Sequence, residues 1–190
     1  ELLVVQVDPS DSIWASQYLN SGRVDGFILM TSTRKQWHIK TLVEMGAPFI
    51  AWGVPSAKHR YCTVTGDNVT GGRLATEHLI GLGRQRIAFL GGAQDEAEVQ
   101  LRFEGYKSAF ENAGRGVDLD LLAYGDYSHG SGILAMQQLF EQAPDLYAVF
   151  VNRDVMAIAA IDVIQKRGKN VPQDVAVATD ERVAYEPDDP

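Results

Sequence analysis

The stretch DNVTGGRLATEHLIGLGRQRIAFLGG, residues 67–92, decides the fold, because it predicts a helix, a turn and a buried strand in succession. Its apolar stripe recurs at the helical spacing of three and four residues, at Leu74, His78, Leu79 and Leu82. Asp67 stands where a helix N-cap belongs, and Gly83 stands where a helix-ending glycine belongs. The continuous apolar run at residues 87–90 is then typical of a strand that is buried on both faces.

Helical apolar stripes and continuous apolar runs alternate along the rest of the chain. Further apolar runs predict buried strands at residues 2–7, 26–30, 48–52, 147–151 and 174–178. Further helical stripes cover residues 103–113, 133–140 and 156–164. Because buried strands that alternate with helices form parallel sheets covered on both faces, the predicted fold class is α/β with doubly wound parallel sheets.

Two glycines interrupt the first turn of the helix in the opening stretch. Gly71 and Gly72 each cost roughly 1 kcal/mol of helix stability relative to alanine. We therefore expect another part of the molecule to approach this backbone closely. A second lobe and a bound ligand are the two candidates.

Composition excludes several classes of protein. The 190 residues are enough for one domain or for two lobes of roughly 100 residues each. Seventeen basic and 25 acidic residues give a net charge of −8, so the chain has no strong attraction for nucleic acid or an anionic membrane. No apolar run approaches the roughly 20 residues of a membrane-spanning helix, and we expect no signal peptide at Glu1.

Motifs of catalysis and of metal binding are missing from the sequence. It contains neither a phosphate-binding G-x-x-x-x-G-K-[ST] loop nor a G-x-S-x-G nucleophile elbow. The single cysteine, Cys62, excludes an internal disulfide, and it is interpreted as a small buried hydrophobic residue rather than a nucleophile. The four histidines lack metal-ligand spacing, and His78 is interpreted as a packing residue of its helix. We expect no enzymatic activity, no metal and no cofactor.

Polar residues follow several of the predicted strands, at the edge where open α/β sheets bind ligands. They are Thr31, Ser32, Asn152, Arg153, Asp154, Thr179 and Asp180, and Gly53 follows the strand predicted at residues 48–52. Structural roles compete with ligand binding at some of these positions. Thr31 can simply shape a turn, Asp154 can cap the following helix, and Arg153 can be a solvated surface residue.

The ordered set of motifs resembles the lactose/galactose repressor (LacI–GalR) family over nearly the whole chain, from about residue 2 to residue 178. The matching segments are VDGFIL at 24–29, DN at 67–68, GGRLATEHL at 71–79, LGRQRIAFLGG at 82–92, RFEGY at 102–106, AVF at 148–150, DVMA at 154–157 and VPQDVAV at 171–177. The resemblance implies the fold of type 1 periplasmic sugar-binding proteins, with two α/β lobes that close on a small effector.

The resemblance also implies a domain organisation. Residues 1–83 would form an N-terminal lobe that is incomplete, since the first strand and helix of the family are missing. Residues 84–178 would form the C-terminal lobe, and residues 179–190 a crossover or truncated end. The family further implies an N-terminal helix-turn-helix headpiece that binds operator DNA and is not in this chain, a homodimer, and a bacterial cytoplasmic location without membrane attachment.

The site residues carried over from the family are Arg102, Tyr127, Arg153, Asp180, Thr31 and Gly53. Arg102 matches the arginine of an R-x-x-G-aromatic motif and suits bidentate hydrogen bonds to ring hydroxyls, a salt bridge with Glu98 or Glu104 being the alternative. Tyr127 matches an aromatic residue that lies against a sugar face, unless it packs in the core.

Three of these positions depart from the family pattern. Arg153 stands where many members carry Asn. Ala178-Thr179-Asp180-Glu181 replaces a Gly-aromatic-Asp segment, so Asp180 or Glu181 takes the place of the usual ligand aspartate. Gly53 stands where several members have a polar side chain, so that it contributes backbone alone.

The function implied by the resemblance is the effector-sensing core of a LacI-type transcription regulator, with a small effector bound between the lobes. A sugar is the effector that the family favours. A periplasmic sugar-binding protein for transport or chemotaxis is the alternative from another class. A sugar- or nucleotide-modifying α/β enzyme is a third hypothesis, and it would require turnover of a bound ligand.

Overall fold

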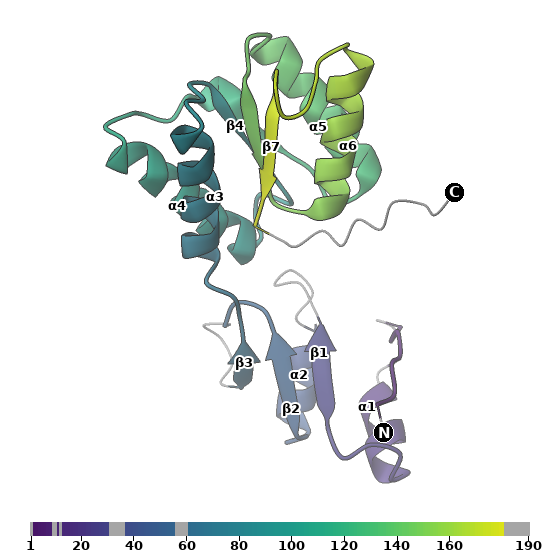
Figure 1. The fold of residues 1–190 in the computed structure, drawn as a ribbon. Coiled ribbons are helices and arrows are strands. Elements are labelled where there is room, and N and C mark those ends of the chain that lie inside the picture. Colours follow the sequence, from purple (N-terminus) through teal and green to yellow (C-terminus); the bar gives the residue numbers. More distant parts are fainter. Residues whose placement is uncertain (1, 9–10, 12, 31–36, 56–60, 181–190) are drawn as a thin grey trace. The chain divides into compact units, whose positions relative to one another are not determined.

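The computed structural model describes residues 2–8, 11, 13–30, 37–55 and 61–180, and it divides the chain into two compact units. The first unit comprises residues Glu1–Gly66 and the second Asp67–Pro190. Figure 1 shows strands and helices alternating along both units. Each unit contains one parallel sheet, which confirms the predicted α/β class.

The first unit is a three-stranded parallel sheet with helices packed on one face. Its elements are α1 (Trp14–Asn20), β1 (Phe27–Met30), α2 (Trp37–Glu44), β2 (Phe49–Trp52) and β3 (Cys62–Val64), with strand order β1-β2-β3. Trp14 and Leu42 form its core together with side chains of β1 and β2. The Trp14 and Phe27 rings meet edge to face, with centroids 5.0 Å apart.

The opposite face of this sheet is apolar and exposed. Because side chains alternate along a strand, the residues between the core positions point away from the helices. Ile28 and Met30 of β1 are 69% and 77% exposed, and Trp52 and Val64 are about half exposed. A sheet with one uncovered apolar face is consistent with the incomplete lobe that the sequence predicts.

Residues 2–7 do not form the predicted strand. Leu2, Leu3, Val4 and Val5 are exposed, and the segment has no strand assignment. An isolated strand is not stable in water without a partner, and no described strand pairs with this segment. The prediction of a buried strand from this apolar run is therefore wrong.

The second unit is a four-stranded parallel sheet of order β5-β4-β6-β7 that is covered on both faces. Its elements are α3 (Asn68–Gly81), β4 (Ile87–Gly91), α4 (Ala97–Asn112), the 3₁₀ turn η1 (Leu119–Leu121), β5 (Leu122–Tyr124), α5 (His129–Gln142), β6 (Ala148–Val151), α6 (Asp154–Lys166) and β7 (Ala176–Thr179). Helices α3 and α4 pack on one face, and α5 and α6 pack on the other.

Strand alternation divides the core of this unit into two layers. Phe89 and Phe150 lie in the layer under α3 and α4, together with Tyr106. Leu90 and Val151 lie in the layer under α5 and α6. Strands β4 and β6 are buried along their whole length, as the continuous apolar runs predict.

The boundary between the units lies between Gly66 and Asp67, earlier in the sequence than the predicted boundary after residue 83. The difference arises because α3 packs along α4 and belongs to the second unit. A Cβ atom on Gly72 would collide with the carbonyl oxygen of Arg102, and one on Gly105 would collide with that of Val69. The close neighbour that Gly72 requires is therefore a helix of its own unit.

Helix α3 begins and ends where the sequence predicts. The Asp67 side chain accepts a hydrogen bond from the Thr70 amide at 3.0 Å, as an N-cap does. Gly83 has φ +76° beyond the helix end, in the left-handed region that glycine tolerates. The two local signals for the ends of this helix are thus confirmed.

The buried face of α3 differs from the predicted one. Leu74, His78 and Leu82 are exposed, so His78 is not the packing residue that the apolar stripe predicted. The buried side of the helix is instead formed by Asn68, Gly72, Thr76 and Leu79. Small residues allow the close contact with α4, which a row of leucines could not.

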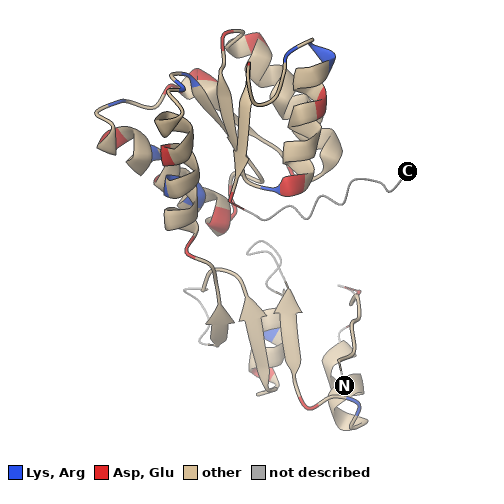
Figure 2. Cartoon of the chain, viewed as in Figure 1, with Lys and Arg blue, Asp and Glu red and all other residues tan. Residues whose placement is uncertain are grey.

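Charged residues are confined to the helices and the connecting segments. No strand in the described ranges contains Lys, Arg, Asp or Glu, and in Figure 2 the colours of charged residues fall on helices and connecting segments. Strands buried on both faces cannot keep a charge hydrated, which explains the composition of β4 and β6 in the second unit. Any charge at a sheet edge therefore comes from the segment that follows a strand or from a helix.

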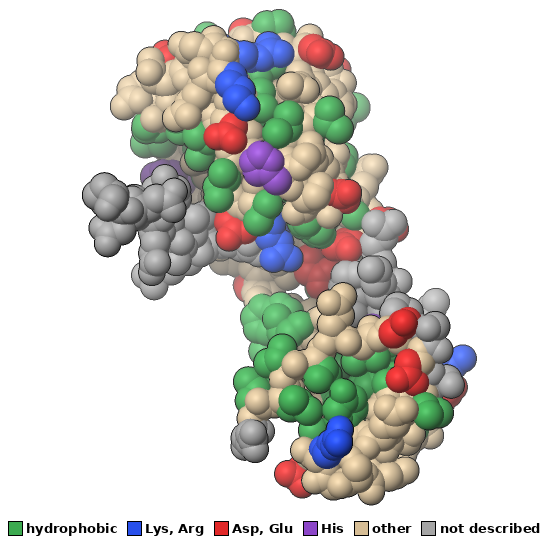
Figure 3. All heavy atoms as spheres, turned by 90° about the vertical axis from the view of Figure 1, so that its right-hand side faces the viewer, with side chains coloured by type: hydrophobic (Ala, Val, Ile, Leu, Met, Phe, Trp, Pro, Cys, Tyr) green, Lys and Arg blue, Asp and Glu red, His purple; other side chains and the backbone are tan. Residues whose placement is uncertain are grey.

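Some hydrophobic side chains remain at the surface of the second unit. Leu134 of α5 and Val155 and Ile158 of α6 are at least 40% exposed. Figure 3 views this unit from the side of α6 and shows hydrophobic surface interrupted by charged groups. None of the helices in the described ranges is both long and apolar enough to cross a bilayer.

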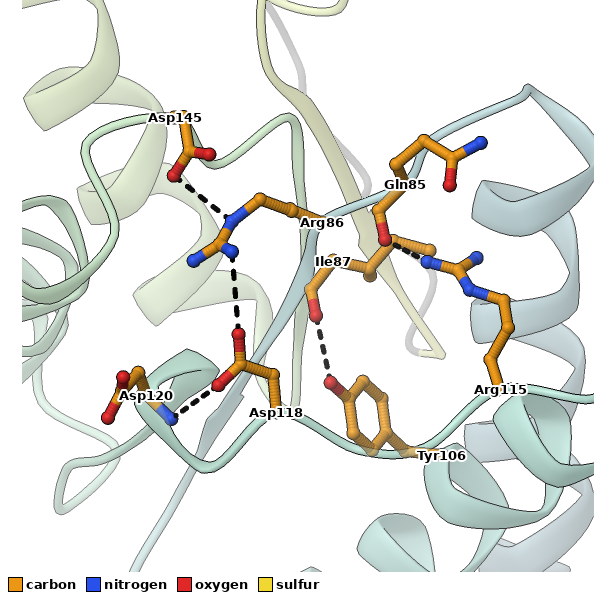
Figure 4. Close-up of polar contacts among 8 residues, drawn as sticks. All are labelled: Gln85, Arg86, Ile87, Tyr106, Arg115, Asp118, Asp120 and Asp145. Carbon is orange, nitrogen blue, oxygen red and sulfur yellow. Dashed lines mark hydrogen bonds and ion pairs between the residues drawn. The ribbon is translucent and has the colours of Figure 1, made fainter.

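A polar network surrounds the amino end of β4 (Figure 4). Arg86 pairs with Asp145 at 3.0 Å and with Asp118 at 3.5 Å, and the buried Tyr106 hydroxyl donates to the Ile87 carbonyl at 2.8 Å. Burial raises the pKa of Tyr106. This network joins α4 and the segments before β5 and β6 to β4, at the edge opposite the carboxyl ends of the strands.

The contact between α3 and α4 predicts an asymmetric response to alanine at two glycines of the same helix. Gly72→Ala should destabilise the chain by about 1–3 kcal/mol, because the added methyl meets backbone that cannot move aside. Gly81→Ala should be neutral or stabilising by up to about 1 kcal/mol, since nothing beyond its chain neighbours and the backbone of its own helix lies within 4 Å of the place its methyl would take. Urea unfolding of both variants measures the difference, and equal stabilities would contradict the packing of α3 on α4.

Candidate functional site

Polar side chains converge at the carboxyl edge of the four-stranded sheet in the second unit. Because all four strands are parallel, the segments that follow them share this edge, where open α/β sheets bind ligands. The segments begin at Gly92 after β4, Gly125 after β5, Asn152 after β6 and Asp180 after β7. Helix α4 adds Arg102 from one face of the sheet.

Arg102 ties α4 to the ends of two strands. Its Nε lies 2.7 Å from Oδ2 of Asp180, and its Nη1 donates to the carbonyl oxygen of Asn152 at 2.9 Å. The side chains of Arg102 and Asp180 are only 14% and 9% exposed. An ion pair so shielded from water is weakly screened, and loss of either partner would leave a poorly hydrated charge.

Asp180 also lies against α3. A Cβ atom on Gly71 would come within 3.3 Å of Oδ2 of Asp180. The two glycines in the first turn of α3 thus have different neighbours. Gly72 allows α4 to pack closely, and Gly71 lies beside the Asp180 carboxylate, which pairs with Arg102. Both neighbours belong to the second unit, so neither requires a second lobe.

Asn152, whose backbone carbonyl accepts the hydrogen bond from Arg102, is completely buried. Its backbone amide donates to the Leu90 carbonyl at 3.0 Å, which continues the hydrogen bonding of β6 with β4. Its side-chain Oδ1 and Nδ2 have no hydrogen-bond partner among the described residues. A buried amide without a partner costs roughly 1–3 kcal/mol of stability. Asn152 was recognised from the sequence as a strand-end residue but was not included among the site residues.

Tyr127 is held in an unusual conformation beside the same edge. Its φ of +69° lies in the left-handed region, which a tyrosine rarely adopts. Its ring lies against Gly92, where a Cβ atom would collide with the ring carbons. The Arg153 guanidinium lies over the ring, with Cζ 5.1 Å from the centroid, as in a cation–π contact.

Glu96, directly before α4, adds a buried carboxylate to this cluster. Burial raises the pKa of Tyr127, and the nearby, hydrogen-bonded Glu96 carboxylate raises it further. The phenol therefore stays protonated and donates its hydrogen bond to the Glu96 carboxylate. Glu96 was not among the predicted site residues, since a single acidic residue before a helix resembles an ordinary N-terminal helix charge.

The loop that carries Tyr127 is fixed by its own polar groups. Asp126 accepts from the Ser128 amide at 3.0 Å, and the Ser131 hydroxyl accepts from the Asp126 amide at 3.0 Å. Hydrogen bonds from Ser128 and Ser131 lower the pKa of Asp126 to about 2. Ser128 in turn caps α5 by accepting from the Ser131 amide at 3.1 Å. Tyr127 is thus presented by a pre-organised turn.

Four of the predicted site residues therefore lie at one edge of the second unit. Arg102 contacts Asp180, and Tyr127 contacts Arg153. Gly53 lies in the first unit after β2, with φ +132° and its amide donating to the Val64 carbonyl at 3.0 Å. Thr31, Ser32 and Glu181 fall outside the described residues.

Two further interpretations of the sequence are wrong, those of Cys62 and Asp154. Cys62 is exposed at the start of β3, contrary to the prediction of a buried residue, because β3 turns this side chain toward the uncovered face of its sheet. Asp154 is the first residue of α6 rather than its N-cap, and it accepts from the Val155 amide at 2.7 Å. The described residues contain no group of three or more side chains placed to hold a metal ion.

Known proteins resemble this chain in sequence. The family described as periplasmic binding proteins and sugar binding domain of LacI family matches residues 1–187. The HTH-type transcriptional regulator CelR of Thermobifida fusca is 40% identical over 164 residues, which are 84% of this chain and 48% of CelR. The ribose operon repressor of Escherichia coli K12 is 31% identical over 162 residues, 82% of this chain and 47% of the repressor. The chain thus spans about half the length of these curated relatives.

Solved structures share the fold. A complex of the transcriptional regulator CelR with cellobiose has a TM-score of 0.79 at 36% identity, covering 90% of this chain and 53% of that one. A LacI-family regulatory protein from Chloroflexus aggregans has a TM-score of 0.80 at 27% identity, covering 91% of this chain and 62% of that one.

Two ion pairs made by arginines of α3 and α4 predict very different mutational costs. Asp180→Asn should destabilise the chain by about 3 kcal/mol, because it removes one charge of a shielded pair while the Arg102 cation stays poorly hydrated. Glu77→Gln is the matched control: its pair with Arg73 is 2.8 Å long but about one-third exposed, and its loss should cost at most about 1 kcal/mol. Urea unfolding measures both, and a small loss for Asp180→Asn would show that the edge pair is not a structural tie.

Proposed function

This chain belongs to the family of periplasmic binding proteins and sugar-binding domains of the LacI family, and from that premise we propose that it is the effector-sensing core of a bacterial transcription regulator. The observation that carries the proposal is the convergence of Arg102, Tyr127, Arg153 and Asp180 on the carboxyl edge of one sheet. The relatives CelR, catabolite control protein A and the ribose operon repressor are transcriptional regulators, which favours this function over a periplasmic carrier or an enzyme.

The effector proposed for this site is a sugar. Arg102 offers paired N–H donors to adjacent ring hydroxyls, and Asp180 is a neighbouring hydroxyl acceptor. The half-buried Tyr127 ring can lie against the apolar face of a sugar ring while its hydroxyl hydrogen-bonds. The relative CelR was solved with cellobiose, so a β-linked glucose disaccharide is the first candidate. The family resemblance adds Gly53 and Thr31 to the proposed effector-binding residues.

The mechanism proposed for regulation is a population shift. A sugar that binds one arrangement of the two units better than another moves the equilibrium toward it by its difference in affinity. A helix-turn-helix headpiece outside residues 1–190 would convert that shift into altered binding of operator DNA. The net charge of −8 agrees with this division of labour, since the headpiece would supply the phosphate contacts. The protein would act in the bacterial cytoplasm, without a cofactor or a membrane partner.

A homodimer is part of the same proposal, because two headpieces are needed to read two half-sites of an operator. Sedimentation velocity of the full-length regulator at micromolar concentration should show a species of twice the protomer mass. A purely monomeric sample would contradict the dimer.

Binding of a sugar should raise the melting temperature of the chain. At a sugar concentration a hundred times Kd the stabilisation is about 2.7 kcal/mol, or roughly 5–10 °C for a chain of this size. Thermal-shift assays with cellobiose, other mono- and disaccharides, sugar phosphates and nucleobases test this expectation. Arg102→Ala should abolish the shift, because it removes the donors to the ring hydroxyls.

Arg73→Ala provides the control, since Arg73 is an arginine of α3 whose described contact is the partly exposed pair with Glu77. This variant should retain the shift seen with wild type. The proposal fails if no compound stabilises the wild-type chain, or if Arg102→Ala responds to the sugar as strongly as Arg73→Ala does.

A further inference from the structure

Asn152 presents a fully buried side-chain amide whose oxygen and nitrogen have no partner in the described part of the chain. We propose that Asn152 is an effector-binding residue, whose amide hydrogen-bonds a sugar hydroxyl and helps to select the sugar. This inference rests on the proposed function and adds a residue to that site. It follows from the position of Asn152, from its contrast with the other buried polar groups, and from the chemistry of its amide.

The backbone fixes where the Asn152 side chain lies. Its amide donates to Leu90 of β4, and its carbonyl accepts from Arg102, so both main-chain groups are already used. Because side chains alternate along an extended strand, Asn152 follows Phe150 on the face covered by α3 and α4. Arg102 and Asp180 occupy the same face at the same edge. The unused amide therefore belongs to the cluster that contains the predicted sugar-binding residues.

Asn152 is one of four polar residues in the described part of the second unit that are buried as whole residues, and the other three, Asn68, Thr76 and Glu96, each have an interaction inside the protein. The Thr76 hydroxyl donates to the Gly72 carbonyl at 2.7 Å, and Glu96 is hydrogen-bonded with Tyr127. Asn68, another buried asparagine, also has an interaction with the rest of the protein. Since buried polar groups in folded proteins are nearly always paired, an exception beside a ligand site points to a partner that arrives with the ligand.

The chemistry of the amide fits a hydroxyl. Nδ2 donates hydrogen bonds and Oδ1 accepts them, and a sugar hydroxyl does both. Asn152 exposes no surface in this arrangement, so a neighbouring side chain must move before a sugar can reach it. Arg102 is one neighbour at this position, because its guanidinium donates a hydrogen bond to the Asn152 backbone carbonyl. A sugar that takes over the donors of Arg102 is thereby brought beside Asn152.

The test separates ligand binding from a structural role by two readouts, the affinity for sugar and the stability without it. Asn152→Leu keeps a similar side-chain volume but removes the donors and the acceptor, and Asn152→Ala removes the amide without adding bulk. Isothermal titration with cellobiose should show Kd raised at least about tenfold in both variants, as expected for the loss of hydrogen bonds to a buried amide. The melting temperature without sugar should be unchanged or higher in Asn152→Leu, because no bond within the protein is lost.

Asn68→Ala is the matched control, a buried asparagine with an interaction inside the protein. It should lower the melting temperature and leave Kd for cellobiose unchanged. If both Asn152 variants bind cellobiose as wild type does while Arg102→Ala does not, the inference about Asn152 is wrong and the sugar site stands. A lower melting temperature with unchanged Kd would identify a structural amide, satisfied by buried water. If wild type binds neither cellobiose nor any other sugar tested, the proposed function fails and the inference falls with it.

Discussion

The close contact of α3 with α4 is the constraint on which the candidate site depends. Glycines lie where the two helices meet: Gly72 faces the carbonyl of Arg102, and Gly105 faces the carbonyl of Val69. Because the contact is made with the backbone of Arg102 itself, it fixes the point from which that arginine reaches Asn152 and Asp180. A larger residue at Gly72 would displace α4 and with it the guanidinium.

The long, regular elements of the second unit could be predicted from the sequence because several local signals agreed there. The apolar runs at β4 and β6 are uninterrupted, and Asp67 and Gly83 mark the ends of α3 as N-cap and left-handed glycine. The shortest elements carried too little signal. Strands β3 and β5 have three residues each, and helix α1 has no side-chain cap. The buried side of α3 was also misjudged, because close helix packing selects small residues instead of large apolar ones.

In the candidate site, too, the sequence located individual residues, whereas the contacts between them depend on the three-dimensional fold. Family motifs located Arg102, Tyr127, Arg153 and Asp180 as individual positions, but no local pattern showed which of them would touch. Arg102 donates a hydrogen bond to the carbonyl of Asn152, which is 50 residues away in the sequence. Only the order of the strands in the sheet brings these two groups together. The unpartnered amide of Asn152 could not be foreseen either, since whether a polar group finds a partner depends on the packed structure around it.

The uneven distribution of tryptophan gives the molecule a built-in optical label. Trp14, Trp37 and Trp52 all belong to the first unit, and the second unit, Asp67–Pro190, has none. Trp14 is buried, whereas Trp52 lies on the uncovered face of the sheet. Intrinsic tryptophan emission therefore reports on the smaller unit alone, while far-ultraviolet circular dichroism is dominated by the helices of the larger one. Recording both signals in a single denaturation experiment distinguishes concerted melting of the two units from stepwise melting.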